Sequence, residues 1–299
     1  MKQTNSTARS AVRQFVRCLA VFSVMAAAYA ADAPQAAVPT LFIASDSTAS
    51  VYSENPKRLQ GWGAVLQPYF DEHKLVVNDV ARPGRSSRTF VTEGHWDKML
   101  ADLRNGDFVI IQFGHNDSGA VNEEPPGSTR QARARGTIKG TGDESQEIDN
   151  VITGKHETVY SFGWYLRKMI ADVRGKGATP ILLTLTKDNY WKDGRIECAS
   201  NTFRKWIWET SQTEHVAFVD LTRIGADRYQ KEGPEATKAQ FIDDPVHSNI
   251  DGATANAENV VSGLVTLENL PFRKMLSTEG RKIAADRGPP KDSVCPSLG

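Results

Sequence analysis

The sequence predicts an α/β domain in which helices cover both faces of a parallel sheet, and two patterns lead to this prediction. Five short runs of apolar and β-branched residues are nearly continuous, as expected for strands buried on both faces. These runs are residues 40–44, 75–80, 107–113, 180–185 and 216–221. Segments with helical periodicity lie among them. Because strands and helices alternate, we expect a five-stranded parallel sheet within a three-layer α/β/α sandwich.

Three segments have the periodicity of an amphipathic helix. In the first, apolar residues recur at i, i+3, i+4, i+7 and i+8, namely Trp62, Val65, Leu66, Tyr69 and Phe70. The second extends over residues 162–173 with the same pattern. The third is expected to begin at Ser248, because Asp251 three residues later favours a helix N-terminus.

Residues 119–158 interrupt the alternation, because they are rich in glycine, proline, threonine and charged side chains. Within and just beyond this region, residues 145–159 resemble two extended pieces joined at Thr153 and Gly154. A loop without regular structure is the alternative. We favour a hairpin, since insertions at the edge of a sheet often frame a functional site.

The first thirty residues have the three parts of a secretory signal peptide. Four cations without an acid are followed by an apolar stretch at residues 18–28 and by the cleavage motif Ala28-Tyr29-Ala30. That stretch is too short to span a bilayer permanently. The alternative is an amphipathic helix of the folded protein. We therefore predict a signal peptide at 1–30, one α/β domain at 31–270 and a polar tail at 271–299, in a secreted or periplasmic protein.

The charge balance and the cysteines restrict the partners of such a chain. Cleavage after Ala30 would change the balance from 36 basic against 36 acidic residues to 32 against 36, because four cations are removed. A net negative domain lacks the basic surface that nucleic acids require, and no later segment is long and apolar enough for a membrane span. The two remaining cysteines, Cys198 and Cys295, are able to form one disulfide in an oxidising compartment, although the sequence does not show that they meet.

Motifs for common cofactors are missing from the sequence. There is no phosphate-binding loop, and Gly61-Trp62-Gly63 begins a dinucleotide fingerprint whose third glycine position holds Leu66. The six histidines form no i, i+4 pair and have no cysteine partners. We therefore expect neither a metal nor a cofactor.

Four polar clusters lie where the predicted strands end or where the last helix begins. They are the segments SDST at 45–48, ARPGRSSRTF at 81–90, FGHND at 113–117 and DDPVHSN at 243–249. Parallel α/β sheets bind ligands outside the carboxyl ends of their strands. We therefore expect these four segments to converge at one edge of the sheet.

The clusters contain the groups that transfer of an acyl group from an ester requires. Ser47 is the candidate nucleophile and His247 the candidate base. Asp244 is the candidate that orients the imidazole, because Pro245 favours a turn across which the two side chains meet; Asp243 is the rival. The backbone N–H groups of Ser47 and Gly84 and the side-chain amide of Asn116 are the candidate oxyanion donors.

These four segments occur in the order of the blocks of the SGNH (GDSL-like) hydrolases, and the sequence resembles the rhamnogalacturonan acetylesterase branch in particular. The segments GRSSRTF, IQFGHNDSG, GTGDESQE and WKDGR carry that resemblance. It implies a flavodoxin-like fold, a Ser-His-Asp triad without a metal, and removal of acetyl groups from pectin. It also assigns Ser47, Gly84, Asn116, Asp244 and His247 the roles given above. One departure is Ser45, where the family usually has glycine.

Candidate substrate contacts are less specific. Arg85 and Arg88 are suited to the carboxylates of galacturonate, with internal pairing as the alternative. His115 is a candidate lining residue, and Trp191 is a candidate for stacking on a sugar or for packing. The expected partner is an acetylated polysaccharide. The alternatives are an acetylesterase for xylan, for another acetylated carbohydrate or for a small ester, and an inactive carbohydrate-binding protein.

Overall fold

A computed structural model describes residues 37–298 except 54, 56, 124–132 and 199–201. The predicted signal peptide at 1–30 lies outside these residues. Among the described residues, no helix is both long enough and apolar enough to cross a membrane.

The central sheet has five parallel strands, which confirms the predicted fold class. Its spatial order is β2-β1-β3-β6-β9. The strands are β1 (Thr40–Ser45), β2 (Val76–Asp79), β3 (Phe108–Gln112), β6 (Thr179–Leu183) and β9 (Ala217–Val219). Strands β1 and β3 are the most buried and pair in register from Leu41 with Phe108 to Ser45 with Gln112.

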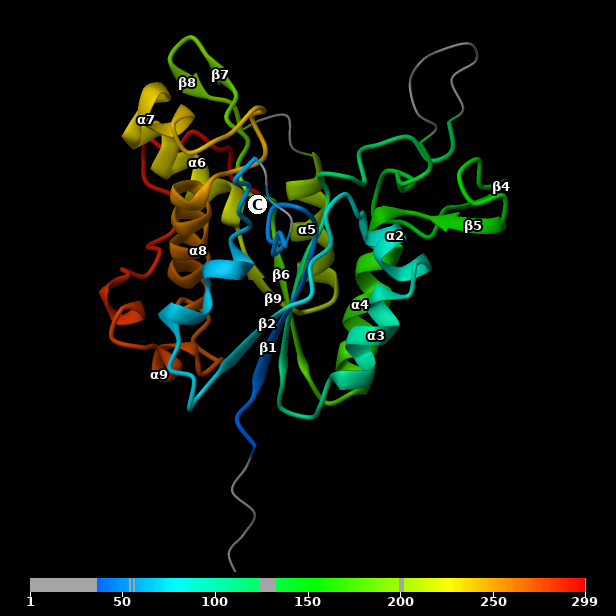
Figure 1. Cartoon of the computed structure of the whole chain (residues 1–299), viewed down its shortest axis with the longest axis horizontal. Helices are drawn as coiled ribbons and strands as arrows, with labels where there is room; N and C mark the ends of the chain where they lie inside the picture. Colours follow the sequence, from blue (N-terminus) through cyan, green and yellow to red (C-terminus); the bar gives the residue numbers. More distant parts are fainter. Residues whose placement is uncertain (1–36, 54, 56, 124–132, 199–201, 299) are drawn as a thin grey trace, which may run out of the picture. The chain divides into compact units, whose positions relative to one another are not determined.

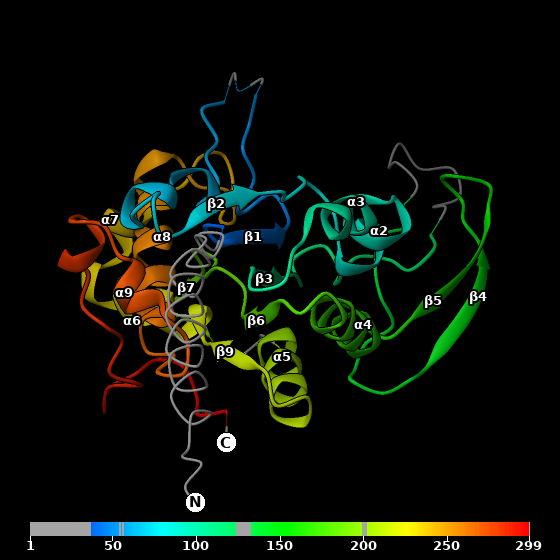
Figure 2. The same ribbon diagram turned by 90° about the horizontal axis from the view of Figure 1, so that it is seen from below.

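Helices cover both faces of the sheet, so the molecule has three layers (Figure 1 and Figure 2). On one face, Phe42 and Ala44 pack on α2 (Ser87–Thr92), α3 (His95–Asp102), α4 (Phe162–Gly175) and α5 (Thr202–Thr213). On the other face, Leu41 and Ile43 pack in a core that includes α8 (Ile250–Leu264) and α9 (Phe272–Met275). Helix α6 (Leu221–Glu232) contacts α8 and is followed by α7 (Pro234–Lys238). Alternate residues of one strand therefore contribute to two separate cores.

The helix expected around residues 62–70 is instead two short 3₁₀ turns, η1 (Gly63–Val65) and η2 (Gln67–Tyr69). Pro68 explains the difference, because it lacks the N–H group that a continuous α-helix would need at that position. The apolar pattern still has its effect, since Trp62, Leu66 and Phe70 are buried in the core.

Helix α8 begins at Ile250, two residues later than Ser248. Asn249 is its N-cap, and its side chain accepts hydrogen bonds from the N–H groups of Asp251 and Gly252 at 3.0 and 3.1 Å. The hydroxyl of Ser248 instead donates to the carbonyl of Gln60 at 2.9 Å. An amide oxygen at Asn249 therefore pairs two N–H groups that the first helical turn leaves without partners.

The insertion after β3 contains the expected hairpin, formed by β4 (Ser145–Asp149) and β5 (His156–Tyr160). The two strands are antiparallel and pair from Ser145 with Tyr160 to Asp149 with His156. This hairpin lies beside α2 and α4, away from α6 and α8 (Figure 1 and Figure 2). A second, smaller hairpin joins β7 (Trp191–Lys192) to β8 (Arg195–Ile196).

Residues after α8 attach to the domain through apolar contacts, polar contacts and a disulfide. Phe272 and Leu276 are buried in the core, where Phe272 contacts the rings of Phe70 and Phe108. A 3₁₀ turn, η3 (Gly280–Lys282), follows. Further along, Cys198 and Cys295 form a disulfide with their Cα atoms 5.0 Å apart. The last residues are thereby connected to the segment that follows β8.

Candidate active site

The first polar cluster is a tight turn at the carboxyl end of β1. The carboxylate Oδ1 of Asp46 accepts hydrogen bonds from the N–H and the hydroxyl of Thr48, both at 2.9 Å. This local ring holds the residue between them, Ser47, at the tip of the turn. Ser45 donates its hydroxyl to Gln112 Oε1 at 2.9 Å and does not have a positive φ. The replacement of glycine at position 45 is therefore accommodated by a paired hydroxyl inside the fold.

Three side chains form a continuous hydrogen-bonded chain at this edge of the sheet. Ser47 Oγ lies 2.9 Å from His247 Nε2, although the two residues are 200 positions apart in the sequence. His247 Nδ1 lies 2.7 Å from Asp244 Oδ2. Asp243, the rival for this contact, pairs with exposed Lys57 at 2.8 Å instead. The arrangement has the order of nucleophile, base and orienting carboxylate.

A single turn fixes the carboxylate and the imidazole relative to one another. Asp244 Oδ1 accepts the N–H groups of Val246 and His247, each at 2.8 Å, so the other oxygen points at the ring. Burial would raise the pKa of Asp244, but the hydrogen bonds from His247 and Val246 outweigh it and lower that pKa. An ionised Asp244 keeps the ring proton on Nδ1 and leaves the lone pair of Nε2 directed at Ser47.

Backbone and side-chain N–H groups belong to residues that line the same cleft as Ser47. The N–H groups of Ser47 and Gly84 donate to no acceptor in the described part of the chain. Asn116 uses one amide hydrogen on the carbonyl of Arg85, with a distance of 3.1 Å, and retains a second one. Gly84 has φ of 76°, which a residue with a side chain adopts only with strain. Unpaired N–H groups of this kind are able to stabilise an oxyanion.

A buried carboxylate joins the two loops that carry these donors. Asp117, the neighbour of Asn116, accepts hydrogen bonds from the N–H of Ser87 at 3.1 Å and from its hydroxyl at 2.5 Å. Burial raises the pKa of Asp117 to about 7. Ser86 caps α2 in a reciprocal pair with Thr89. The helix start and the Asn116 loop are thus fixed to one another directly behind the oxyanion groups.

The three side chains of the hydrogen-bonded chain and the residues that carry the N–H groups line one cleft of about 1160 Å³. Its lining includes Ser47, Gly84, Asn116, Asp244 and His247, so the sequence-predicted residues meet at one place. We call this the catalytic cleft.

Four further residues of the catalytic cleft had no clear signal in the sequence. They are Tyr52, Lys187, Asp188 and Tyr190. Tyr52 donates its hydroxyl to the carbonyl of Ser47 at 2.8 Å, and burial raises its pKa to about 12. Lys187 is only 6% exposed, and burial lowers its pKa. For these four residues the sequence offers one signal, since Lys187 and Asp188 follow the end of a predicted apolar strand.

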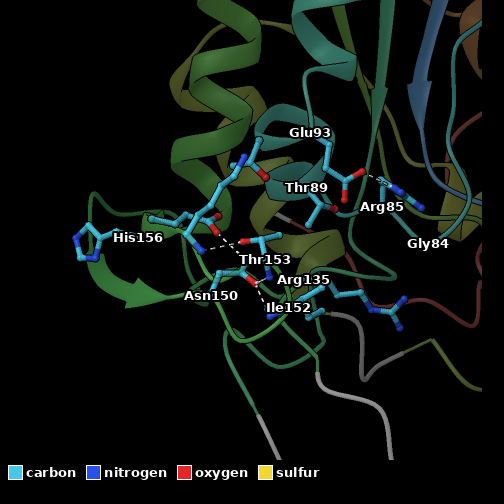
Figure 3. Close-up of a pocket in the computed structure, with 13 residues that line it drawn as sticks. Gly84, Arg85, Thr89, Glu93, Arg135, Asn150, Ile152, Thr153 and His156 are labelled. Atoms are coloured by element: carbon cyan, nitrogen blue, oxygen red, sulfur yellow. Dashed lines mark hydrogen bonds and ion pairs between the residues drawn. The ribbon is translucent and has the colours of Figure 1, made fainter.

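The four candidate substrate contacts have different positions. His115 lines the catalytic cleft, with Nε2 at 3.1 Å from the hydroxyl of Thr186. Arg85 pairs with Glu93 at 2.8 Å and lines an adjacent pocket (Figure 3). Trp191 is absent from the lining of the catalytic cleft and donates its ring N–H to Asn189.

The expectation that Arg88 contacts substrate is wrong. Its side chain is fully buried, and Nε donates to Glu157 at 2.7 Å. Nη1 donates to the carbonyls of Val121 and Gly136 at 2.7 and 2.8 Å. Arg88 is thus internally paired, because helix α2 directs it beneath the insertion. For metals, no group of three or more potential ligands converges among the residues with described positions.

Known proteins resemble this chain in sequence and in fold. It is 28% identical to a rhamnogalacturonan acetylesterase of Emericella nidulans, over 78% of this chain and 87% of that protein. It is 27% identical to the rhamnogalacturonan acetylesterase RhgT of Bacillus subtilis, over 81% and 96% respectively. The solved structure of the B. subtilis protein YXIM aligns with this one at a TM-score of 0.60 and 25% identity. The alignment covers 77% of this chain and 57% of the YXIM chain.

A mutant acetyl-xylooligosaccharide esterase of Geobacillus stearothermophilus has a solved structure with the same fold, at a TM-score of 0.50 and 15% identity. The alignment covers 76% of this chain and 94% of that chain. The sequence also matches the GDSL-like Lipase/Acylhydrolase family over residues 46–255, which include the first turn after β1, both oxyanion loops and the turn that carries Asp244 and His247. The chain belongs to the GDSL-like lipase/acylhydrolase family.

Proposed function

We propose that this protein is a secreted serine esterase that removes O-acetyl groups from a pectic polysaccharide, rhamnogalacturonan. At the coarser level it is a carbohydrate acetylesterase, as the names of its relatives indicate. The observation that carries the proposal is the chain of contacts from Ser47 through His247 to Asp244, with distances of 2.9 and 2.7 Å.

In the first half of the reaction, Ser47 Oγ attacks the acetyl carbonyl carbon while its proton passes to His247 Nε2. The carbonyl oxygen becomes an oxyanion and accepts hydrogen bonds from Ser47 N–H, Gly84 N–H and the Asn116 amide. The tetrahedral species then collapses, and the bond to the sugar oxygen breaks. That oxygen takes the proton from His247, so the sugar leaves as an alcohol and the acetyl group remains on Ser47.

In the second half, water repeats the attack in place of the serine. His247 accepts a proton from the water as its oxygen adds to the acyl carbon. Collapse of this second tetrahedral species returns the proton to Ser47 Oγ and releases acetate. Asp244 stays ionised throughout and stabilises the imidazolium that forms in each half.

The choice of a pectic substrate is supported by two relatives named as rhamnogalacturonan acetylesterases, each aligned over most of both chains. The rival substrate is acetylated xylan, because one structural neighbour is named as an acetyl-xylooligosaccharide esterase. That neighbour is only 15% identical to this chain, so it supports the fold and not the substrate.

The decisive experiment measures acetate released by the purified chain without residues 1–30. We expect release from acetylated rhamnogalacturonan to exceed release from acetylated xylan at equal acetyl content. Equal or lower release would argue for the rival substrate.

Ser47→Ala tests the nucleophile in the same assay. The variant should fold normally, and its kcat should fall about 10⁵–10⁶-fold, as it does when a serine nucleophile is removed. A fluorophosphonate label should attach to Ser47 in the unsubstituted protein only. Lack of labelling would indicate an inactive binding protein, and retained turnover in Ser47→Ala would exclude Ser47 from the mechanism.

A further inference from the structure

A second cleft adjoins the catalytic cleft. It has a volume of about 700 Å³, and its lining comes from α2 and its N-terminal loop, from residues 134–135 and from the hairpin of β4 and β5 (Figure 3). Gly84 and Arg135 line both clefts, so the two are continuous beside the oxyanion loop. We call the second one the hairpin cleft.

We propose that the hairpin cleft binds the carboxylate of a second acidic sugar unit in the same polymer, near the acetylated one, and that Arg135 is the residue that recognises it. This inference rests on the proposed function and specifies the substrate of the same site as an extended polymer that contains uronic-acid units.

The charges of the two clefts support an anionic ligand. Arg135 and Lys155 line the hairpin cleft, and Arg133 and Lys139 line the catalytic cleft. None of these four cations forms an ion pair with any carboxylate whose position is described. The carboxylates of the hairpin cleft are already paired, since Glu93 contacts Arg85 and Glu157 contacts Arg88. The remaining charge is positive, as an anionic polymer requires.

Arg135 is the cation best placed to select a carboxylate near the reacting ester. A Cβ built on Gly84 would lie 3.8 Å from Arg135 Nη1, which puts the guanidinium beside the oxyanion loop. Figure 3 shows the side chain extending to the side of the cleft on which Gly84 lies. Its Nε is buried and has no acceptor in the described structure. The terminal Nη groups also have no hydrogen-bond partner among the described residues, so they are the groups able to form a charge-assisted hydrogen bond with a carboxylate in the cleft.

The backbone holds Arg135 in place before any ligand binds. The N–H groups of Arg135 and Gly136 both donate to the carbonyl of Ala120, at 3.2 and 2.8 Å. Gly136 also approaches Gly119 so closely that a Cβ on it would lie 1.9 Å from the Gly119 carbonyl oxygen. Only glycine permits this contact. A fixed backbone reduces the ordering cost of binding.

The hairpin side of the cleft has groups suited to a sugar. Thr153 and Ile152 are exposed there, Ile152 by 60% (Figure 3). Asn150 is buried; its Oδ1 accepts the N–H groups of Ile152 and Thr153, and its Nδ2 donates to Glu157 at 2.9 Å, which links the hairpin to the buried pair of Glu157 with Arg88. A hydroxyl group beside an exposed apolar side chain fits a carbohydrate, and the cation adds selectivity for an acidic one.

The test compares Arg135→Ala with a control, Arg273→Ala. Arg273 is an exposed arginine on α9 that lines neither cleft. The substrates are acetylated rhamnogalacturonan oligosaccharides, which are acidic, and the neutral acetylated xylo-oligosaccharides and p-nitrophenyl acetate. For Arg135→Ala we expect kcat/KM on the acidic substrate to fall about tenfold more than on either neutral one. Arg273→Ala should behave like the unsubstituted protein on all three. An equal fall on acidic and neutral substrates would overturn the proposal.

A binding measurement separates failure of this proposal from failure of the proposed function. An unacetylated oligogalacturonide, which offers no acetyl group to cleave, is titrated calorimetrically into the unsubstituted protein and into both variants. We expect the Kd to rise about tenfold in Arg135→Ala alone. Such binding without any acetate release would support the carboxylate site and reject the esterase. Acetate release with the same Kd in all three proteins would support the esterase and reject the site.

Discussion

The edge of the sheet and the inserted hairpin position their functional groups in different ways. At the edge, strands and short turns are sufficient: Asp46 pairs with Thr48 two residues away, and Asp244 pairs with His247 three residues away. In the insertion, the important contacts join distant segments. Arg88 reaches Glu157 across 69 residues. Each reacting group is therefore oriented by a local turn, and the strands bring these turns together, as in the contact of Ser47 with His247 across 200 residues. The proposed recognition groups instead depend on tertiary attachment of an added segment.

This difference separates the expected consequences of substitution. A change at the edge removes a group that acts in the transition state of the proposed mechanism, so it should reduce turnover while the fold persists. A change in the insertion should alter affinity for an extended substrate or the stability of the hairpin, since no reacting group is attached there. Each substitution below tests whether the two regions are separable in this way.

Among the substitutions that test this comparison, the largest effect is expected for Asp244→Asn, although it is smaller than that of Ser47→Ala. An amide at this position favours the wrong tautomer of His247 and cannot stabilise the imidazolium, so kcat should fall about 10⁴-fold. The measurement is turnover of p-nitrophenyl acetate together with the midpoint of thermal unfolding.

Asp243→Asn is the matched control, because this neighbouring carboxylate is exposed and pairs only with Lys57. Exposed ion pairs contribute at most about 1 kcal/mol, so both turnover and unfolding should stay close to those of the unsubstituted protein. A large loss of turnover in Asp243→Asn, with a small one in Asp244→Asn, would reverse the assignment of the orienting residue.

Sequence patterns predicted the edge of the sheet well because its geometry follows from periodicity and chain order. Buried parallel strands are continuous apolar runs, and their carboxyl ends lie at one edge, so the meeting of Ser47 with His247 follows from the fold class. The pre-proline turn also distinguished Asp244 from Asp243. These contacts depend on spacing that can be read directly along the chain.

The substrate-facing residues were harder to predict because exposure depends on tertiary packing. Arg88 looked like a cation near the oxyanion loop, but helix α2 turns it under the insertion, where it is fully buried. Tyr190, not Trp191, lines the catalytic cleft, since adjacent residues of an extended segment point in opposite directions. Arg135 lies in an irregular segment without any period from which its direction could be inferred.

A smaller effect than that of Asp244→Asn is expected for Asn116→Ala, which removes one oxyanion donor and leaves the triad intact. Loss of such a donor costs about 10²–10³ in turnover. The fall should appear in kcat for every ester, including p-nitrophenyl acetate, because the oxyanion is common to all of them. Asn78→Ala is the matched control. Asn78 lies at an exposed position of the edge strand β2, so its loss should leave kcat unchanged.

Selective loss on polysaccharide alone in Asn116→Ala would contradict this role. Asn116 would then belong with the recognition groups, and the boundary between the two regions would have to be moved into the third polar cluster.

The smallest effect on chemistry is expected for Glu157→Gln, which tests how the hairpin is attached. Arg88 would keep its carbonyl partners but lose its counter-charge in a buried position, which should destabilise the protein by about 1–3 kcal/mol. Glu147→Gln, on the exposed side of the same hairpin, is the matched control and should change stability by less than about 0.5 kcal/mol. Denaturant unfolding of the three proteins measures both differences.

The pH dependence of this difference identifies its cause. Burial would raise the pKa of Glu157, but the hydrogen bonds from Arg88 and Asn150 hold it below its ordinary value of 4.5. A carboxylate with a lowered folded pKa contributes stability that is present above that ordinary value and disappears as the pH falls through the folded pKa. The gap between the unsubstituted protein and Glu157→Gln should therefore close in acid. A gap that stays constant with pH would mean that packing of the hairpin, and not the ion pair with Arg88, attaches this region to α2.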